Sequence, residues 1–305
     1  MAGQTYLTSK TRNWKHVASC HPVPTGHPGL ATIQALAAKI APSDIVAVVR
    51  DPQKAADTLP QGLTVRQGDY NDPAALLTAF QGVETVLLIS TSELDYDVRL
   101  RQHRNVIDAA KQAGVRHIVY TSVVNPSPNS AFGASPGHYA TEEYLRASGL
   151  TYTIFRNTLY LDIVPMLVGE GTLPSGKLFS SAGDGKVSYG LRAEMGEALA
   201  NVLAGQGHEN QVYDIAPAPA YSFQDLAATL SEVTGQPVEY VPISGEDIAA
   251  GMRQHQVPQP FINLTLGMNQ AMKDGEFATP SDTLEKLLGR KPTDLKAYLK
   301  SVYGK

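Results

Sequence analysis

Two glycines at the start of an apolar helical pattern form the first candidate site. In "HPVPTGHPGLATIQAL" (residues 21–36), Gly26 and Gly29 stand three residues apart, and Val23 takes the place of a third glycine in a G-x-x-G-x-x-G turn. Glycines let a backbone approach a ligand closely, and the free N–H groups at a helix N-terminus bind anions such as a pyrophosphate. Chance glycines in a loop are the alternative. We predict that the residues binding the pyrophosphate of a dinucleotide are Thr25, Gly26, His27 and Gly29.

Two basic residues follow the apolar run "DIVAVV" (44–49). Arg50 stands 21 residues after Gly29, and Lys54 lies four residues further along. At the end of the second strand of a dinucleotide-binding unit, an acidic residue binds the ribose of NAD, whereas a basic one accommodates the extra phosphate of NADP. Arg50 and Lys54 therefore favour NADP as the cofactor, and a solvated basic pair in a loop is the alternative.

Polar residues also mark the ends of later apolar runs. Ligands of open α/β sheets bind at the carboxyl ends of the strands, so such residues are expected to surround the reactive ring of the cofactor. For the cofactor-binding set we name Tyr70, Ser90, Thr91, Ser92, Thr121 and Ser122. For the reacting centre we name Asn157 and Tyr160, at and after the run 150–157. Hydroxyls that only cap loops are the alternative.

The helix expected over 138–148 lacks the catalytic pair of ordinary short-chain dehydrogenases, in which lysine follows a tyrosine acid by four residues. Here Glu143 follows Tyr139 at that spacing, and an anion cannot lower the pKa of a tyrosine as a lysine does. Ordinary alcohol–ketone chemistry is therefore disfavoured. We expect His138 to cover the cofactor or to donate a proton, so it joins the catalytic set; a helix-start histidine with no chemical role is the alternative.

Composition excludes several other classes of protein. The chain has 305 residues, 43% of them hydrophobic and 18% charged, and it can therefore bury a full core. Its net charge of −4 gives no electrostatic reason to expect nucleic acid or a membrane surface as a partner. The single cysteine, Cys20, excludes a disulfide framework and a cysteine-based zinc site, and we expect no bound metal. No apolar run approaches the roughly 20 residues of a membrane-spanning helix, so we expect a cytoplasmic protein.

Apolar strand patterns alternate with helical patterns as far as residue 157. The predicted strands are 14–20, 44–49, 63–69, 84–90, 116–122 and 150–157, and the predicted helices include 72–80, 97–113 and 138–148. Nearly continuous apolar strands separated by helices indicate a parallel sheet covered on both faces, and right-handed crossovers make it doubly wound. We therefore predict an α/β fold with a doubly wound, Rossmann-type parallel sheet, in which residues 1–157 form the cofactor-binding domain and the first 22 or so are atypical.

The pattern changes after residue 157. A loop-rich stretch is followed by "YSFQDLAATLSEVTG", which predicts a capped helix ending at Gly235, and two more helical stretches close the chain. We interpret residues 158–305 as a small C-terminal α/β lobe that covers the substrate, with some strands and helices returning to the main domain.

Several long motifs carry a family resemblance. "VVRDPQKA", "VRQGDYNDPAAL", "LLIST", "AGVRHIVYTS", "HYATEEYLRASGLTYTIFRNTLY" and "GHENQVYDIAPAPAYSFQDLAATLSEVTGQPV" resemble the NmrA-like branch of atypical short-chain dehydrogenases. Within it, the pattern is most similar to the bacterial NADPH-dependent quinone oxidoreductase type 2 and triphenylmethane reductase group. The resemblance spans about residues 25–303 and implies a Rossmann domain with a small lobe that uses NADPH without a Tyr-Lys pair.

Two functions fit this pattern. Quinones and extended conjugated dyes accept hydride with little help from an acid, because the product anion is delocalised or a charge is cancelled, so a site without a strong acid suits them. The first hypothesis is therefore an NADPH-dependent oxidoreductase with a quinone-like small-molecule acceptor, acting as a monomer or homodimer. The alternative is a non-catalytic, NADP(H)-sensing regulatory protein, as NmrA-like proteins can be.

Overall fold

A seven-stranded parallel sheet forms the centre of the larger part of the molecule. The computed structural model describes residues 16–19, 28–55 and 57–304. The strands of this sheet are β1 (His16–Ser19), β2 (Ile45–Val49), β3 (Thr64–Gln67), β4 (Thr85–Leu88), β5 (His117–Val123), β6 (Thr151–Asn157) and β9 (Gln211–Ile215). Their order is β3-β2-β1-β4-β5-β6-β9, and neighbouring strands all run parallel. The predicted doubly wound sheet is confirmed, and the first six strands have the Rossmann order.

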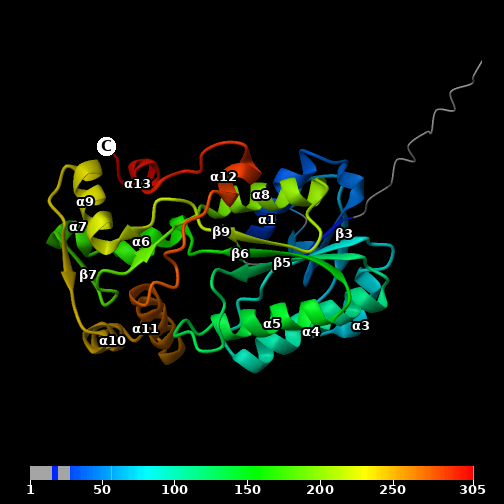
Figure 1. The fold of residues 1–305 in the computed structure, drawn as a ribbon, viewed down its shortest axis with the longest axis horizontal. Helices are drawn as coiled ribbons and strands as arrows, with labels where there is room; N and C mark the ends of the chain where they lie inside the picture. Colours follow the sequence, from blue (N-terminus) through cyan, green and yellow to red (C-terminus); the bar gives the residue numbers. More distant parts are fainter. Residues whose placement is uncertain (1–15, 20–27, 56, 305) are drawn as a thin grey trace, which may run out of the picture.

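Helices cover both faces of this sheet (Figure 1). One face packs against α3 (Pro73–Ala79), α4 (Tyr96–Gln112) and α5 (Ser135–Ala147), and the other against α1 (Pro28–Ala37), α8 (Arg192–Ala204) and α12 (Thr283–Leu288). Successive side chains of a strand point to opposite faces. In β2, for example, Val46 and Val48 join the core with α3 and α4, whereas Ile45 and Ala47 join the core with α1 and α8. Both cores are buried, so the strands are apolar on both sides.

A capping residue and a glycine help to position two of the helices on the sheet. The Asp72 carboxylate accepts hydrogen bonds from the backbone N–H groups of Ala74 and Ala75, so it caps α3 as predicted. On the opposite face, α8 approaches α1 closely, because a Cβ on Gly196 would lie 2.8 Å from the Ala31 side chain. This contact holds the helix that follows β1 against the sheet.

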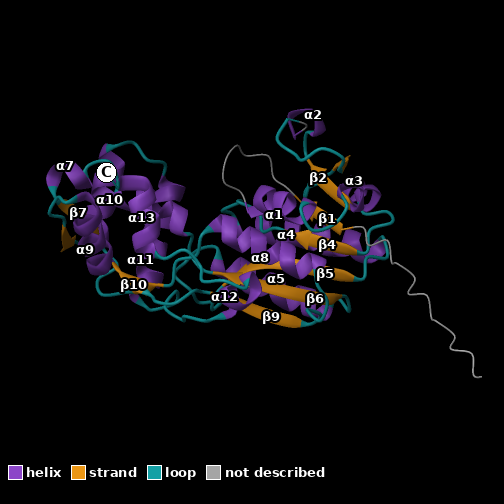
Figure 2. Cartoon of the chain, turned by 90° about the horizontal axis from the view of Figure 1, so that it is seen from above, coloured by secondary structure: helices purple, strands orange, loops and turns teal. Residues whose placement is uncertain are grey.

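The smaller lobe lies beside the sheet and is rich in helices (Figure 2). Its elements are α6 (Val164–Val168), α7 (Thr172–Ser175), β7 (Lys177–Ser180), β8 (Lys186–Val187), β10 (Tyr221–Ser222), α9 (Phe223–Thr234), β11 (Glu239–Pro242), α10 (Gly245–Gln254), α11 (Gln259–Lys273) and α13 (Leu295–Tyr303). Strand β7 pairs with β11 and β8 with β10, and buried residues such as Leu178, Phe223 and Leu299 form the core of the lobe. Three short helical segments complete the described structure: Pro42–Asp44, α2 (Pro52–Ala55) and Leu161–Ile163.

The C-terminal half is more divided than the sequence predicted. Helix α9 has the predicted cap, a reciprocal Ser222–Asp225 capping box, and ends at Gly235. Four helices follow it in the described chain, whereas two were predicted, because the start of α11 after Pro258 and the left-handed Gly289 separate short segments. Residues 158–305 also supply β9, α8 and α12 to the larger part.

The lobe is anchored where β5 and β6 end. The backbone of Tyr160 forms a bridge with Gly190, and Asn125 Nδ2 donates to the carbonyl of Glu276 at 2.7 Å. Gly267 in α11 packs directly on the carbonyl of Ala131, and any Cβ there would collide with it. The lobe therefore covers the carboxyl edge of the sheet.

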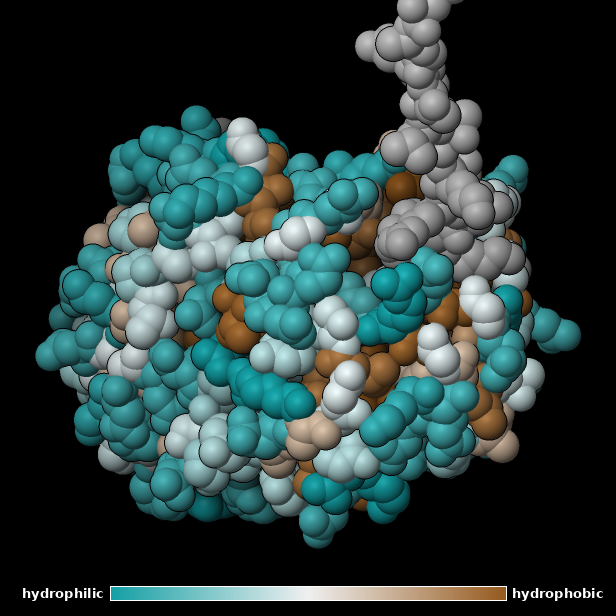
Figure 3. All heavy atoms as spheres, turned by 45° about the vertical axis from the view of Figure 1, so that its right-hand side comes forward, coloured by the Kyte–Doolittle hydropathy of each residue, from teal (hydrophilic) through white to brown (hydrophobic). Residues whose placement is uncertain are grey.

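The outer surface shown in Figure 3 is mostly hydrophilic, with small separate hydrophobic spots. Scattered spots of this kind are normal on a folded protein in water. None of the helices in the described part of the chain is both long and apolar enough to cross a bilayer.

Candidate functional site

The strand order reverses between β1 and β4, which is where doubly wound sheets bind their ligands. Helix α1 starts beyond β1, and Gly29 is buried in its first turn. The other members of the predicted glycine turn, Thr25, Gly26 and His27, and with them Val23, lie outside the described residues. Of this turn, the structure therefore places Gly29 alone, at a helix N-terminus beside the switch point.

Arg50 and Lys54 differ in their availability at the end of β2. Arg50 is exposed, and its side chain makes no ion pair within the described structure. Lys54 lies 3.5 Å from the carboxylate of Asp51, which also caps α2 by accepting from the backbone of Gln53 and Lys54. The backbone hydrogen bond from Lys54 lowers the pKa of Asp51, so this carboxylate stays ionised and remains paired with Lys54. Of these two cations, Arg50 is therefore the one without an acidic partner in the described residues.

Ser90 and Thr121 meet at the ends of β4 and β5. The backbone N–H of Ser90 donates to Thr121 Oγ1 at 2.8 Å, and Ser90 Oγ accepts from Arg99 at 2.7 Å. The hydroxyl of Tyr70 donates to the carbonyl of Ile89 at 2.9 Å, directly before Ser90. Tyr70 therefore supports the end of β4, and three of the predicted residues, Tyr70, Ser90 and Thr121, lie together at this point.

Thr91 and Ser92 continue this edge. The backbone N–H of Thr91 donates to His103 Nε2 at 3.1 Å, and His103 Nδ1 lies 2.9 Å from Thr141 Oγ1. An acceptor at Nε2 leaves the hydrogen of the neutral ring on Nδ1, so His103 links β4 to α5 through Thr141. Thr91 is buried, whereas Ser92 is exposed.

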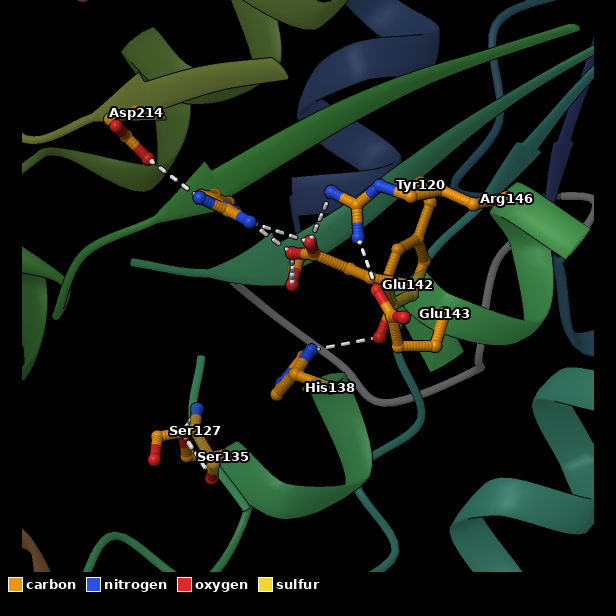
Figure 4. A network of polar contacts seen from close by, with 10 residues as sticks. Tyr120, Ser127, Ser135, His138, Glu142, Glu143, Arg146 and Asp214 are labelled. Carbon is orange, nitrogen blue, oxygen red and sulfur yellow. Dashed lines mark hydrogen bonds and ion pairs between the residues drawn. The ribbon is translucent and has the colours of Figure 1, made fainter. Parts of the chain in front are cut away.

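His138 lies beside Tyr120 of β5 (Figure 4). Its Nδ1 and the hydroxyl of Tyr120 are 2.8 Å apart, and both side chains are buried. Burial, together with the charge of Arg99, lowers the pKa of His138 well below its ordinary value, so the ring is neutral. Burial raises the pKa of Tyr120, which keeps its hydroxyl protonated. In the tautomer in which Tyr120 donates to Nδ1, the ring hydrogen of His138 is on Nε2.

Ser122 faces a different group from its neighbour Thr121. Its hydroxyl donates to Glu142 at 2.6 Å, and Glu142, 1% exposed, also pairs with Arg156 at 2.7 Å and Arg146 at 2.9 Å. Figure 4 shows this network joining β5, α5 and β6, with Asp214 at its outer end. The hydroxyl of Ser122 is thus committed to a buried ion-pair network.

Tyr139 and Glu143 both face away from the strand ends. They line a surface pocket of about 640 Å³ on the outer side of α4 and α5, together with Tyr96, Arg104 and Tyr144. The two positions of a Tyr-x-x-x-Lys pair therefore contribute nothing to the edge of the sheet where Ser90, Thr121 and His138 meet.

Asn157 and Tyr160 follow β6. Asn157 is buried, and neither its amide nitrogen nor its amide oxygen has a hydrogen-bond partner among the described residues. The adjacent Thr158 hydroxyl is also buried and unpaired. An unmet buried polar group costs about 1–3 kcal/mol, so this cluster is suited to a ligand that both donates and accepts. The guanidinium carbon of Arg192 lies 5.2 Å from the centroid of the Tyr160 ring. Burial raises the pKa of the Tyr160 hydroxyl.

Arg99 is a site residue that the sequence prediction missed. It is 6% exposed and contacts Ser90 from the first turn of α4. The signal was present in the helical periodicity, because Arg99, His103, Val106 and Ala110 share the buried face of α4. The sequence prediction considered strand ends and passed over this helix.

The family model described as "NmrA-like family" matches residues 23–299 of the chain. The chain belongs to the NmrA-like family. It is 40% identical to quinone oxidoreductase 2 of Escherichia coli over 271 residues, covering 89% of this chain and 93% of the relative. The resemblance inferred from the motifs is thereby confirmed.

Two solved reductase structures superpose over nearly the whole chain. The NADPH complex of the quinone oxidoreductase QOR2 from Escherichia coli aligns with a TM-score of 0.88 and 37% identity, covering 95% of this chain and 100% of the other. The NADP(H) complex of triphenylmethane reductase from Citrobacter sp. aligns with a TM-score of 0.87 and 36% identity, covering 94% of this chain and 99% of the other. The two TM-scores show that both structures share the fold of this chain.

Proposed function

We propose that this NmrA-like protein is an NADPH-dependent reductase that transfers hydride to quinone-like conjugated acceptors. The observation that carries the proposal is the neutral, buried His138 backed by Tyr120, at a strand edge to which Tyr139 and Glu143 contribute nothing. Such an edge holds hydrogen-bonding groups without an ionised acid–base pair. It suits acceptors that are electrophilic enough to take hydride without strong acid catalysis.

The chain's own residues fit NADPH as the cofactor. The start of α1 at Gly29 would hold the pyrophosphate, and Arg50 would hold the additional phosphate. The unpaired amide of Asn157 offers both a donor and an acceptor, which match the carboxamide of a nicotinamide. When bound there, NADPH supplies the hydride. The close relative and both superposed structures, which are named as oxidoreductases or reductases, support this cofactor and reaction type.

The protein's contribution is to orient the acceptor and to exclude water. His138 offers Nε2–H to the acceptor oxygen while Tyr120 holds the ring in place through Nδ1. Ser90, Thr91 and Thr121 form the strand-end floor, with Thr91 and Thr121 buried. The lobe, joined through Tyr160 and Asn125, closes the edge above them.

Oxidation of NADPH with a panel of acceptors tests the proposal. We expect turnover with 1,4-benzoquinone and 2-methyl-1,4-naphthoquinone, and little with cyclohexanone. His138→Gln should reduce kcat for the quinones by about 10- to 100-fold, whereas Tyr139→Phe, altered on the outer face, should leave it unchanged. Turnover of cyclohexanone that equals turnover of the quinones would contradict the proposed acceptor class. Absence of NADPH binding would contradict the reductase itself.

A further inference from the structure

Arg99 is a buried cation that the proposed mechanism does not use. Its Nε donates to the carbonyl of Glu93 at 3.0 Å and one terminal nitrogen donates to Ser90 Oγ at 2.7 Å. Two neutral acceptors hold the guanidinium in a fixed direction, and its other N–H groups donate no hydrogen bond within the described part of the chain. The side chain is only 6% exposed, so it is removed from bulk water.

No carboxylate of the described residues pairs with Arg99. The charge of Glu93 acts on Arg99 without an ion pair, and the Glu93 carboxylate accepts from the backbone N–H groups of Leu94 and Asp95 at 3.0 and 3.4 Å. Arg156, Arg192 and Arg290, by contrast, each have an acidic partner. A buried charge without a counter-charge is costly, by several kcal/mol in proteins. Arg99 is therefore placed to receive an anion.

The surroundings of Arg99 are the proposed reacting centre. Its charge acts on His138, Tyr120 and Tyr160, which carry the other polar groups of the strand edge. The chain makes room for it specifically, because a Cβ on Gly137 would lie 2.7 Å from Arg99 Cδ. Gly137 directly precedes His138, so the arginine and the histidine enter the same space from α4 and α5.

We propose that Arg99 stabilises the oxygen anion that forms on the acceptor during reduction, and that it thereby selects neutral carbonyl acceptors over cationic dyes. This inference rests on the proposed reductase function and names its substrate class. A quinone takes up one hydride, with its two electrons, from NADPH, which is oxidised to NADP⁺, and the quinone becomes a hydroquinone monoanion. A proton from water then completes the hydroquinone.

The charge balance is different when the acceptor is a cationic triphenylmethane dye. Hydride adds to its central carbon and cancels the positive charge, so the product is neutral and no oxygen anion forms. A buried guanidinium assists the first reaction through attraction to the developing anion and opposes binding of the second acceptor through repulsion. The ratio of the two activities therefore measures the role of Arg99.

Variants of Arg99 separate this role from a structural one. We expect Arg99→Met to lower kcat/KM for 1,4-benzoquinone by about 100-fold, the scale of one oxyanion donor, and to lower it much less, or raise it, for crystal violet. Arg99→Lys should retain part of the quinone activity. The matched control is Arg104→Met on the same helix, where the arginine is exposed and stacks 4.9 Å from the ring of Tyr144; it should change neither value. Equal losses for both acceptors would overturn the proposal.

A binding measurement requires no turnover and uses the unmodified protein. The yellow anion and the colourless acid of 4-nitrophenol are distinguished by their absorbance. We expect the pKa of 4-nitrophenol bound to the cofactor-free protein to be lower than in water, and expect Arg99→Met or Arg99→Lys to reduce this shift. Absence of binding, or a bound pKa that is not lowered, overturns the role of Arg99. Failure of the reductase function appears separately, as absence of NADPH oxidation with every acceptor.

Discussion

The hydroxyl of Tyr120 and Nδ1 of His138 lie 2.8 Å apart, joining the middle of β5 to the first turn of α5. Both side chains are buried, so the ring of His138 is held by a contact that water does not replace. The position of His138 is thus set by a residue deep in the sheet.

Removal of the Tyr120 hydroxyl should therefore loosen His138. We expect Tyr120→Phe to lower the free energy of unfolding by about 1–3 kcal/mol, since Nδ1 then lacks a partner, and to lower kcat for quinones several-fold. Urea denaturation and NADPH oxidation measure the two effects. Tyr139→Phe, exposed on α5, is the control. A stable variant with unchanged kcat would show that the contact does not position His138.

Acidification should destabilise the protein through His138. Burial and the charge of Arg99 lower its pKa, so the unfolded chain, with a histidine pKa of about 6.5, binds a proton that the folded chain resists. The contribution of neutral His138 to the free energy of unfolding should therefore be complete above the unfolded pKa. It should decline as the pH falls through about 6.5. Thermal unfolding across this range should show a shallower decline for His138→Gln. Part of the decline should remain, because burial lowers the pKa of His117 and His208 as well.

Loss of the Glu142 charge should lower the free energy of unfolding far more than loss of the Glu143 charge. Glu142 is buried and pairs with Arg146 and Arg156, so we expect Glu142→Gln to cost about 3–5 kcal/mol in the free energy of unfolding. Glu143→Gln is the matched control, because Glu143 is 57% exposed and should change stability by less than about 1 kcal/mol. Urea denaturation of the two variants compares them. Similar costs would mean that the buried network contributes no more than a surface pair.

Cofactor preference should depend on Arg50 and not on Lys54. We expect NADPH to bind at least tenfold more tightly than NADH, about 1.4 kcal/mol, and expect Arg50→Ala to remove most of this difference. Lys54→Ala should leave it largely intact, because Lys54 is engaged with Asp51. Calorimetric titration with both cofactors gives the ratio. Equal affinities in the unmodified protein would refute the assignment of Arg50.

Much of the fold was predictable because its local signals agree with its packing. The runs at 44–49, 84–90 and 116–122 became buried strands, and Asp72 caps α3 as its place before Pro73 predicts. The strand β9 was not named, because Gln211–Ile215 is mostly exposed and its sequence lacks an apolar run. Its place in the sheet depends on pairing with β6.

The site was less predictable, because adjacent residues of a strand face opposite ways. Thr121 and Ser122 were assigned to one set, yet Thr121 bonds to Ser90 whereas Ser122 turns to Glu142 on α5. The alternation itself was readable, but the partner on α5 was not. Arg99 was likewise not predictable as a site residue, because its neighbours Ser90 and Gly137 lie 9 and 38 residues away along the chain. Only folding brings them beside it.

The place of β9 has a consequence for synthesis on the ribosome. Strand β6 ends at Asn157, but its outer partner begins at Gln211, so more than fifty residues must be added before β6 ceases to be an edge strand. Until then β6 presents unpaired backbone groups, and exposed strand edges recruit other chains into aggregates. The larger part of the protein therefore cannot complete its folding as a nascent N-terminal unit. A chain halted anywhere between these two strands is expected to require a chaperone.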